Sequence, residues 1–206
     1  MTINQKPINS LDWAKGDGLL PAIIQHATEG RVLMLGYMNA DALRKTIETG
    51  QVTFFSRSKQ RLWTKGESSG HVLDLVGVKG DCDRDTLLVQ AIPRGPTCHL
   101  GTQTCFGEEM LPPLGLLAEL ESLIQSRTGE DSSTSYTARL LSEGVARCAQ
   151  KVGEEGVEVA LAAVQGQREE LNSEAADLLY HLLVCLHASG SSLQEVLNIL
   201  RTRRKH

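Results

Sequence analysis

Glu108-Glu109-Met110-Leu111-Pro112-Pro113-Leu114 (residues 108–114) separates two halves of the chain that differ in their sequence patterns. The paired prolines interrupt both strand and helix patterns, because proline lacks the backbone N–H that these structures use. A chain of 206 residues is long enough for two small domains. We therefore expect one domain at residues 1–112 and a second at residues 113–206.

The half that precedes the prolines contains short apolar runs bounded by Gly, Pro, Asp or Asn, a pattern typical of β-strands. One helix is predicted at Asn39–Glu48, with Asn39 as its N-cap and Gly50 at its end. The N-terminal domain should therefore be a β-rich α+β domain. Its strands are expected at residues 18–26, 31–38, 52–55, 72–78 and 86–92.

The half that follows the prolines should be all-α. Residues 115–204 contain no proline, and their apolar residues recur at helical spacing. Gly144, Gly153 and Gly156 are weak points in the longest of these patterns. Helices are predicted at residues 116–126, 135–164, 169–188 and 192–200.

Composition excludes several classes of protein. The formal net charge of −4 argues against general nucleic-acid binding. No apolar run approaches the length of about 20 residues that spans a bilayer, and the first residues do not resemble a secretory signal. The odd number of cysteines, five, favours reduced thiols or metal ligands over disulfides. We therefore expect a cytoplasmic protein that contacts neither membranes nor nucleic acid.

Cys82, Cys98 and Cys105 are candidate ligands of one zinc ion. Catalytic zinc sites use three protein ligands and keep a place for water, which the ion converts to hydroxide near neutral pH. His99 follows Cys98 and is a candidate catalytic residue that exchanges a proton with this water; the alternative is a structural histidine. The remaining cysteines, Cys148 and Cys185, are expected to lie in the helical core.

Three aspartates, Asp81, Asp83 and Asp85, alternate around Cys82. If this segment is extended, the aspartates share one face and Cys82 points to the other. We therefore expect a separate magnesium ion on the aspartates, and a zinc ion that Cys82 shares with Cys98 and Cys105 of a partner subunit in a homodimer. A solvated turn is the alternative for the aspartates.

The polar tract Ser56–His71 combines cations, serines and a tryptophan between two predicted strands. Arg, Lys and hydroxyl groups are common ligands of phosphate oxygens, although such a tract can also form a solvated hairpin. Trp63 could stack on a base or close the core, and the sequence leaves this open. The candidate substrate-binding residues here are Arg57, Trp63, Lys65, Glu67, Ser68 and Ser69.

Acidic residues at helical spacing form a second cluster. Residues three or four apart share a helix face, so two antiparallel helices would bring these carboxylates together. Like charges so close require cations between them, and we predict magnesium, although a solvated acidic face remains possible. The predicted ligands are Glu154, Glu155, Glu158, Glu174 and Asp177.

The motifs of the N-terminal half resemble phosphoribosyl-AMP cyclohydrolase, a histidine-biosynthesis enzyme, over residues 15–107. This resemblance implies a dimer, zinc on the three cysteines and magnesium on the three aspartates. It also implies hydrolytic opening of the adenine ring between N1 and C6 of phosphoribosyl-AMP. The motifs that carry it are Ser56-Arg57-Ser58, Leu62 to Gly70, Asp81 to Asp85, and Cys98-His99 through Cys105-Phe106.

Residues 116–204 resemble phosphoribosyl-ATP pyrophosphohydrolase, on the pairs Glu155/Glu158 and Glu174/Asp177 together with Lys151 to Glu155. The resemblance implies magnesium-assisted release of pyrophosphate from phosphoribosyl-ATP, so that the domain binds an ATP derivative. Glu154 or Glu155 would activate water, and Lys151 would contact phosphate. The expected partners are therefore small phosphoribosyl nucleotides, which the two domains would hydrolyse in consecutive steps.

Two other classes of protein remain as alternatives. A zinc-stabilised scaffold with a helical dimerisation module would have no catalytic activity, and removal of its zinc should unfold the N-terminal domain. A zinc-dependent nucleic-acid binder fits the net charge poorly, and a structural zinc site would need a fourth ligand.

Overall fold

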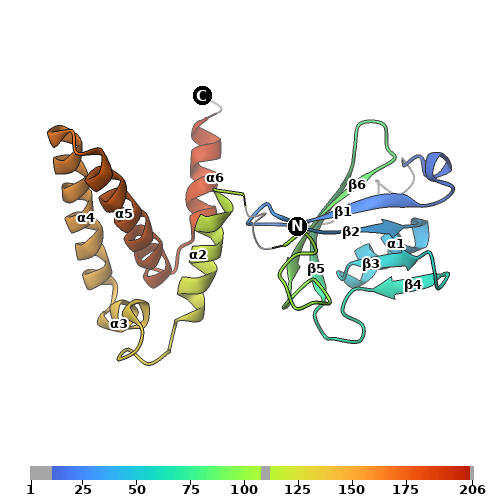
Figure 1. The fold of residues 1–206 in the computed structure, drawn as a ribbon, viewed down its shortest axis with the longest axis horizontal. Helices are drawn as coiled ribbons and strands as arrows, with labels where there is room; N and C mark the ends of the chain where they lie inside the picture. The colour runs from blue at the N-terminus through green and yellow to red at the C-terminus, as the bar shows by residue number, and fades with distance from the viewer. Residues whose placement is uncertain (1–10, 108–111, 205–206) are drawn as a thin grey trace. The chain divides into compact units, whose positions relative to one another are not determined.

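The computed structural model describes residues 11–107 and 112–204. The chain forms two compact units, residues 1–116 and residues 117–206 (Figure 1). Much of the predicted boundary at residues 108–114 lies outside the described residues. The first unit is rich in strands and the second is helical, as the sequence predicts.

The N-terminal unit contains a four-stranded sheet in the order β2-β1-β6-β5. β1 pairs with β2 in antiparallel and with β6 in parallel orientation, and β5 is antiparallel to β6. A two-stranded ladder, β3-β4, is separate from this sheet. The strands are β1 (Leu20–His26), β2 (Val32–Met38), β3 (Thr53–Ser56), β4 (Arg61–Thr64), β5 (Leu73–Gly80) and β6 (Leu87–Pro93).

The alternation of buried and partly exposed residues in the sequence explains why the central segments form strands with one face in the core. In β1, Leu20, Ala22 and Ile24 are fully buried, whereas the residues between them are partly exposed. The helix α1 (Ala40–Thr49) packs on the same core. Its ends match the prediction, because the Asn39 side chain accepts a hydrogen bond from the Ala42 N–H and Gly50 takes a left-handed conformation.

Two segments of this unit differ from the strands expected from the sequence. Arg61–Thr64 forms a strand that was not predicted, β4, so the polar tract closes a hairpin with β3, the alternative that the sequence left open. Asp81–Asp85 is not an extended strand: it is a bent loop between β5 and β6. Arg84 adopts a φ of 67°, a left-handed conformation that ends strand alternation.

The helical unit consists of α2 (Gly115–Ser126), α3 (Tyr136–Glu143), α4 (Val145–Gln165), α5 (Arg168–Ala188) and α6 (Leu193–Arg203). The single helix predicted at residues 135–164 is instead two helices, because Gly144 has φ 88° and ψ 177° between α3 and α4. Gly166 ends α4, and α5 returns antiparallel beside it (Figure 1). Cys148 is buried in the core of this unit and Cys185 packs against that core, as predicted.

None of the described helices is both long enough and apolar enough to cross a membrane.

Candidate active sites

A cavity of about 460 Å³ in the N-terminal unit collects most residues predicted to bind substrate. This volume suits a small ligand. One wall is formed by β4 and the turn that follows it, and the facing wall is formed by residues 96–105. The predicted residues that line it are Trp63, Lys65, Glu67, Ser68, Ser69, Cys98, His99 and Cys105.

Trp63 lies between the hydrophobic core and the cavity, so it contacts both. Its ring stacks on Phe54 with 5.6 Å between the ring centroids, and it packs against the hydrophobic core. It also lines the cavity.

Lys65 is a nearly buried cation at the cavity wall, with 8% of its surface exposed. Its Nζ donates a hydrogen bond to the His71 carbonyl oxygen over 3.2 Å. Burial lowers the pKa of this lysine, while the nearby thiols of Cys105 and Cys98 act in the opposite direction. Such a group would gain from an anionic ligand, which would compensate the burial of its charge.

Arg57 does not line this cavity. Its guanidinium lies over the Tyr37 ring, 3.9 Å from the ring centroid. Glu67, at the cavity wall, forms an ion pair of 2.5 Å with Arg61, which lowers the pKa of Glu67. Arg61 therefore holds the hairpin through Glu67, whereas Lys65 lines the cavity.

The sequence analysis did not single out several other residues of the cavity wall. Thr97 is 3% exposed, and its Oγ1 has no hydrogen-bond partner among the described residues. His71 lies against Gly95, where an added Cβ would come within 2.9 Å of the imidazole. The position of Thr97 directly before Cys98 is the only sequence signal that could have indicated it. The additional lining residues are Met34, Gly66, His71, Pro96, Thr97 and Gly101.

The thiols of Cys98 and Cys105 interact with each other at the cavity wall. Hydrogen bonding from the Leu100 backbone, assisted by Thr102, lowers the pKa of the Cys98 thiol. Burial, and then the negative charge of Cys98, raises the pKa of Cys105. A cation that binds both sulfurs would relieve this repulsion, and a soft metal such as zinc suits two thiolates.

Cys82 is not brought to this pair within one chain. It is exposed in the loop between β5 and β6, with its Sγ 4.0 Å from Asp83 Oδ1. Within the described ranges, no group of three possible metal ligands with atoms closer than 4.8 Å includes a cysteine. The predicted zinc trio is therefore incomplete in a single subunit.

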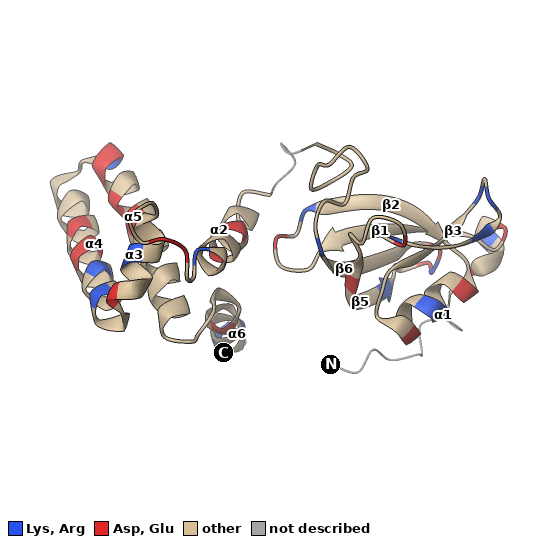
Figure 2. Cartoon of the chain, turned by 90° about the horizontal axis from the view of Figure 1, so that it is seen from below, with Lys and Arg blue, Asp and Glu red and all other residues tan. Residues whose placement is uncertain are grey.

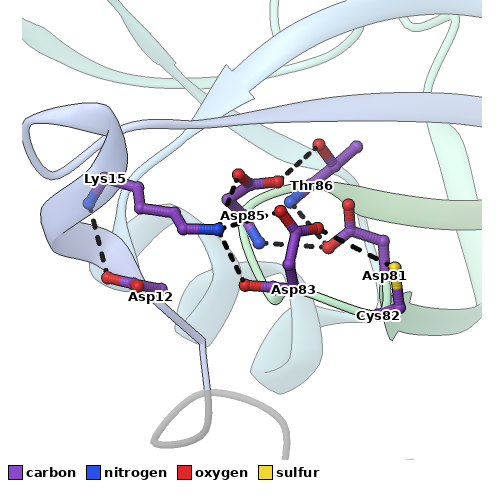
Figure 3. Close-up of polar contacts among 7 residues, drawn as sticks. All are labelled: Asp12, Lys15, Asp81, Cys82, Asp83, Asp85 and Thr86. Carbon is purple, nitrogen blue, oxygen red and sulfur yellow. Dashed lines mark hydrogen bonds and ion pairs between the residues drawn. The ribbon is translucent and has the colours of Figure 1, made fainter.

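Asp81, Asp83 and Asp85 do come together, with ligand oxygens within 4.8 Å of one another. The bent loop, and not the expected strand alternation, gathers them: Asp81 Oδ1 accepts hydrogen bonds from the Asp85 and Thr86 N–H groups. Figure 3 shows that a fourth side chain, Lys15, enters this group. The donor set of three carboxylates fits a hard divalent cation.

A second group forms on the α4–α5 hairpin, where Glu155, Glu158 and Glu174 have ligand oxygens within 4.8 Å of one another. Figure 2 shows acidic positions on both helices. Glu155 is 5% exposed. The pKa of Glu174 is raised, first by desolvation and then by the charge of Glu158. Carboxylates that repel one another in this way fit a divalent cation.

The other predicted residues of the helical site surround this trio. Lys151 Nζ lies 2.6 Å from Glu155 Oε1 and 2.9 Å from Glu154 Oε2, and these hydrogen bonds raise the pKa of Lys151. Glu154 and Asp177 are outside the close trio, although the charge of Asp177 also acts on Glu174. Lys151 therefore contacts carboxylates where the prediction placed phosphate.

His181 is a neighbour of this site that the sequence analysis left unassigned. It is 5% exposed, and its Nε2 lies 3.7 Å from Glu155 Oε1. Its Nδ1 has no hydrogen-bond partner in the described part of the chain. Burial lowers the pKa of this histidine. Its position four residues after Asp177, on one helix face, is the signal that could have indicated it.

The chain has two units, and each has its own chemically distinct candidate site. This arrangement is typical of a bifunctional enzyme. The family model for phosphoribosyl-AMP cyclohydrolase matches residues 34–107, and the model for phosphoribosyl-ATP pyrophosphohydrolase matches residues 117–204. These matches, in this order, fall on the strand-rich and the helical unit respectively.

Three similar proteins are each named histidine biosynthesis bifunctional protein HisIE. Those of Salmonella typhimurium and Escherichia coli K12 are 57% and 56% identical over 203 residues, which cover 98% of this chain and all of each relative. That of Vibrio cholerae is 57% identical over 197 residues, 95% of this chain and 94% of the relative. The chain belongs to this HisIE family of bifunctional histidine-biosynthesis proteins.

Proposed function

We propose that this chain catalyses two consecutive hydrolytic steps of histidine biosynthesis. The helical unit converts phosphoribosyl-ATP to phosphoribosyl-AMP and pyrophosphate, and the N-terminal unit then opens the adenine ring of phosphoribosyl-AMP between N1 and C6. The observation that carries this proposal is that each compact unit holds one family match and one candidate site.

In the N-terminal unit, the cavity residues bind and orient the nucleotide. Lys65 and the hydroxyls of Ser68 and Ser69 bind phosphate, and Trp63 offers its ring to the base. Zinc held by the three cysteines would supply a nucleophile by lowering the pKa of a coordinated water. His99, whose Nδ1 lies 3.9 Å from Cys98 Sγ, is the candidate residue for exchanging a proton with that water.

The three aspartates of the loop between β5 and β6 hold magnesium in this proposal. Their oxygens form a group of suitable size and chemistry, and an ammonium group already lies among them. Magnesium supplies a positive charge that can hold a substrate phosphate. Asp81 also shapes the loop through its backbone hydrogen bonds, so it contributes to loop conformation as well as to charge.

In the helical unit, Glu155, Glu158 and Glu174 hold magnesium, with Asp177 beside them. Magnesium held by these residues would supply positive charge to the polyphosphate and the departing pyrophosphate. Glu154 lies outside the close trio and is the candidate base for the attacking water; its hydrogen bond to Lys151 lowers its pKa and so weakens it as a base until Lys151 turns to phosphate. Lys151 can exchange its carboxylate partners for phosphate oxygens when the nucleotide binds.

A homodimer with a shared zinc site is the second part of the proposal. The distribution of the cysteines supports it, because Cys82 is separate from the cavity thiols in one subunit. An apolar row across the sheet also supports it: Ile23 pairs in register with Leu35 and with Leu88, and these leucines are 46% and 40% exposed. Such a face can be covered by a second copy of the sheet.

Hybrid dimers test the shared zinc site. Neither Cys82→Ser nor Cys98→Ser homodimers should open the ring, because every site lacks one thiolate. Co-expressed chains should recover about a quarter of the wild-type rate, because half of randomly paired dimers are hybrids and each hybrid has one intact site. Recovery is measured as ring-opening rate per total dimer in zinc-saturated protein. Absence of recovery in isolated hybrids would contradict a zinc site shared between subunits.

The overall activity is tested with purified full-length protein, phosphoribosyl-ATP, magnesium and zinc. We expect pyrophosphate to appear first and the ring-opened nucleotide second. The nucleotides are measured by chromatography and the pyrophosphate by a separate assay. Pyrophosphate without any ring-opened product would contradict the function proposed for the N-terminal unit, and intact phosphoribosyl-ATP would contradict that proposed for the helical unit.

A further inference from the structure

A positively charged side chain from a distant part of the sequence, that of Lys15, lies among the three aspartates. Lys15 belongs to the short 3₁₀ helix η2 (Trp13–Gly16). Its Nζ lies 2.9 Å from Asp83 Oδ2 and 3.2 Å from Asp85 Oδ2, and donates to the Asp83 carbonyl oxygen over 3.4 Å (Figure 3). One ammonium group therefore contacts two predicted magnesium ligands at once.

Backbone and apolar contacts hold this helix beside the acidic loop independently of the lysine side chain. The Asp12 N–H donates to the Arg84 carbonyl oxygen over 2.7 Å. Leu11 is buried beside Gly80, where an added Cβ would come within 2.8 Å of the leucine side chain. The Asp12 side chain also caps the helix through the Lys15 N–H. The ammonium group is thus delivered to the loop by a docked segment.

The charges explain why the ammonium group lies there. Three carboxylates within 4.8 Å repel one another, and a positive charge between them offsets this repulsion. A divalent cation would satisfy the same need and would use the same oxygens. The Lys15 ammonium group and a divalent cation cannot both bind Asp83 and Asp85 closely, because the two positive charges would repel each other at short range.

We propose that Lys15 is an internal counter-cation that competes with the divalent ion for Asp83 and Asp85 and so sets the metal affinity of this loop. The proposal rests on the magnesium site proposed above. The lysine side chain is 43% exposed, so its flexible stem can move the ammonium group into solvent when a metal ion binds. In the metal-free protein, the same ammonium group keeps the aspartates together.

Manganese titration followed by electron paramagnetic resonance tests this competition without an activity assay. The full-length protein is loaded with zinc, and carries Glu158→Gln and Glu174→Gln so that the helical site does not bind the probe. Replacement of Lys15 by methionine in this background should tighten Mn²⁺ binding on the order of tenfold, because a nearby positive charge is removed. Lys15→Arg, which keeps the charge, should bind Mn²⁺ like the parent.

Two controls assign the result to the loop and to this lysine. Lys45→Met removes an exposed positive charge from α1, outside the acidic loop, and should leave Mn²⁺ affinity within about twofold of the parent. Asp83→Asn with Asp85→Asn should abolish the loop's Mn²⁺ binding. If the parent binds Mn²⁺ at the loop and Lys15→Met binds it with the same or lower affinity, the proposed competition is wrong, although the metal site stands. Equal binding by the parent and the double asparagine variant would overturn the magnesium site itself.

Discussion

Replacement of Cys98 by serine should lower the rate of ring opening by at least about a thousandfold, because bound zinc lowers the pKa of its water to about 7 and serine is a poor substitute for a thiolate. Pyrophosphate release should stay within about twofold of wild type, since the helical site lies in a separate compact unit. Both rates are measured on one preparation, with phosphoribosyl-AMP and phosphoribosyl-ATP as the respective substrates.

A matched thiol control distinguishes loss of zinc from loss of folding. Cys185→Ser removes a partly buried thiol of the helical unit and should leave both zinc content and ring opening unchanged. Elemental analysis should find less zinc in the Cys98 variant, and circular dichroism should find its secondary structure intact. A folded Cys98→Ser protein that retains ring opening would exclude this thiolate from the reaction.

Replacement of Glu155 by glutamine should slow pyrophosphate release and leave ring opening intact, the reverse of Cys98→Ser. Pyrophosphate release should fall at least about a hundredfold, because the change removes a nearly buried charge from the carboxylate trio that we propose binds magnesium. Ring opening of supplied phosphoribosyl-AMP should persist. The measurement is pyrophosphate production at saturating magnesium, followed by the same assay over a magnesium series to separate weaker binding from slower chemistry.

Glu169→Gln is the matched control for this prediction. Glu169 is an exposed acid in the first turn of α5, so its substitution removes one negative charge from the same helix pair without altering the trio. Both activities should stay near wild type in that variant. Loss of both reactions in a folded Glu155→Gln protein would contradict the independence of the two sites.

Local sequence signals predicted much of the fold. Asn39 and Gly50 mark the two ends of α1 because capping depends on neighbouring residues. The strand β4 was missed because its four residues lie in a polar tract without clear alternation. The break between α3 and α4 depends on one glycine, Gly144, and the sequence shows three glycines in that region without indicating which one interrupts the helix.

The candidate sites were predictable in their residue types and less so in their geometry. The grouping of Asp81, Asp83 and Asp85 was foreseen for the wrong reason, since a bent loop and not a strand gathers them. The contact of Lys15 with Asp83 joins residues 68 positions apart, and no local pattern encodes such a pair. His181 was missed because an isolated histidine on an apolar helix face is usually a core residue.

The account depends on two separate sites that act in sequence on one nucleotide. The most direct measurement follows phosphoribosyl-ATP consumption by the full-length protein in saturating magnesium, before and after removal of zinc with a chelator. The account predicts that zinc-depleted protein still releases pyrophosphate and accumulates phosphoribosyl-AMP, and that added zinc restores ring opening. Undiminished ring opening in protein shown to be free of zinc, or loss of pyrophosphate release on zinc removal, would contradict it.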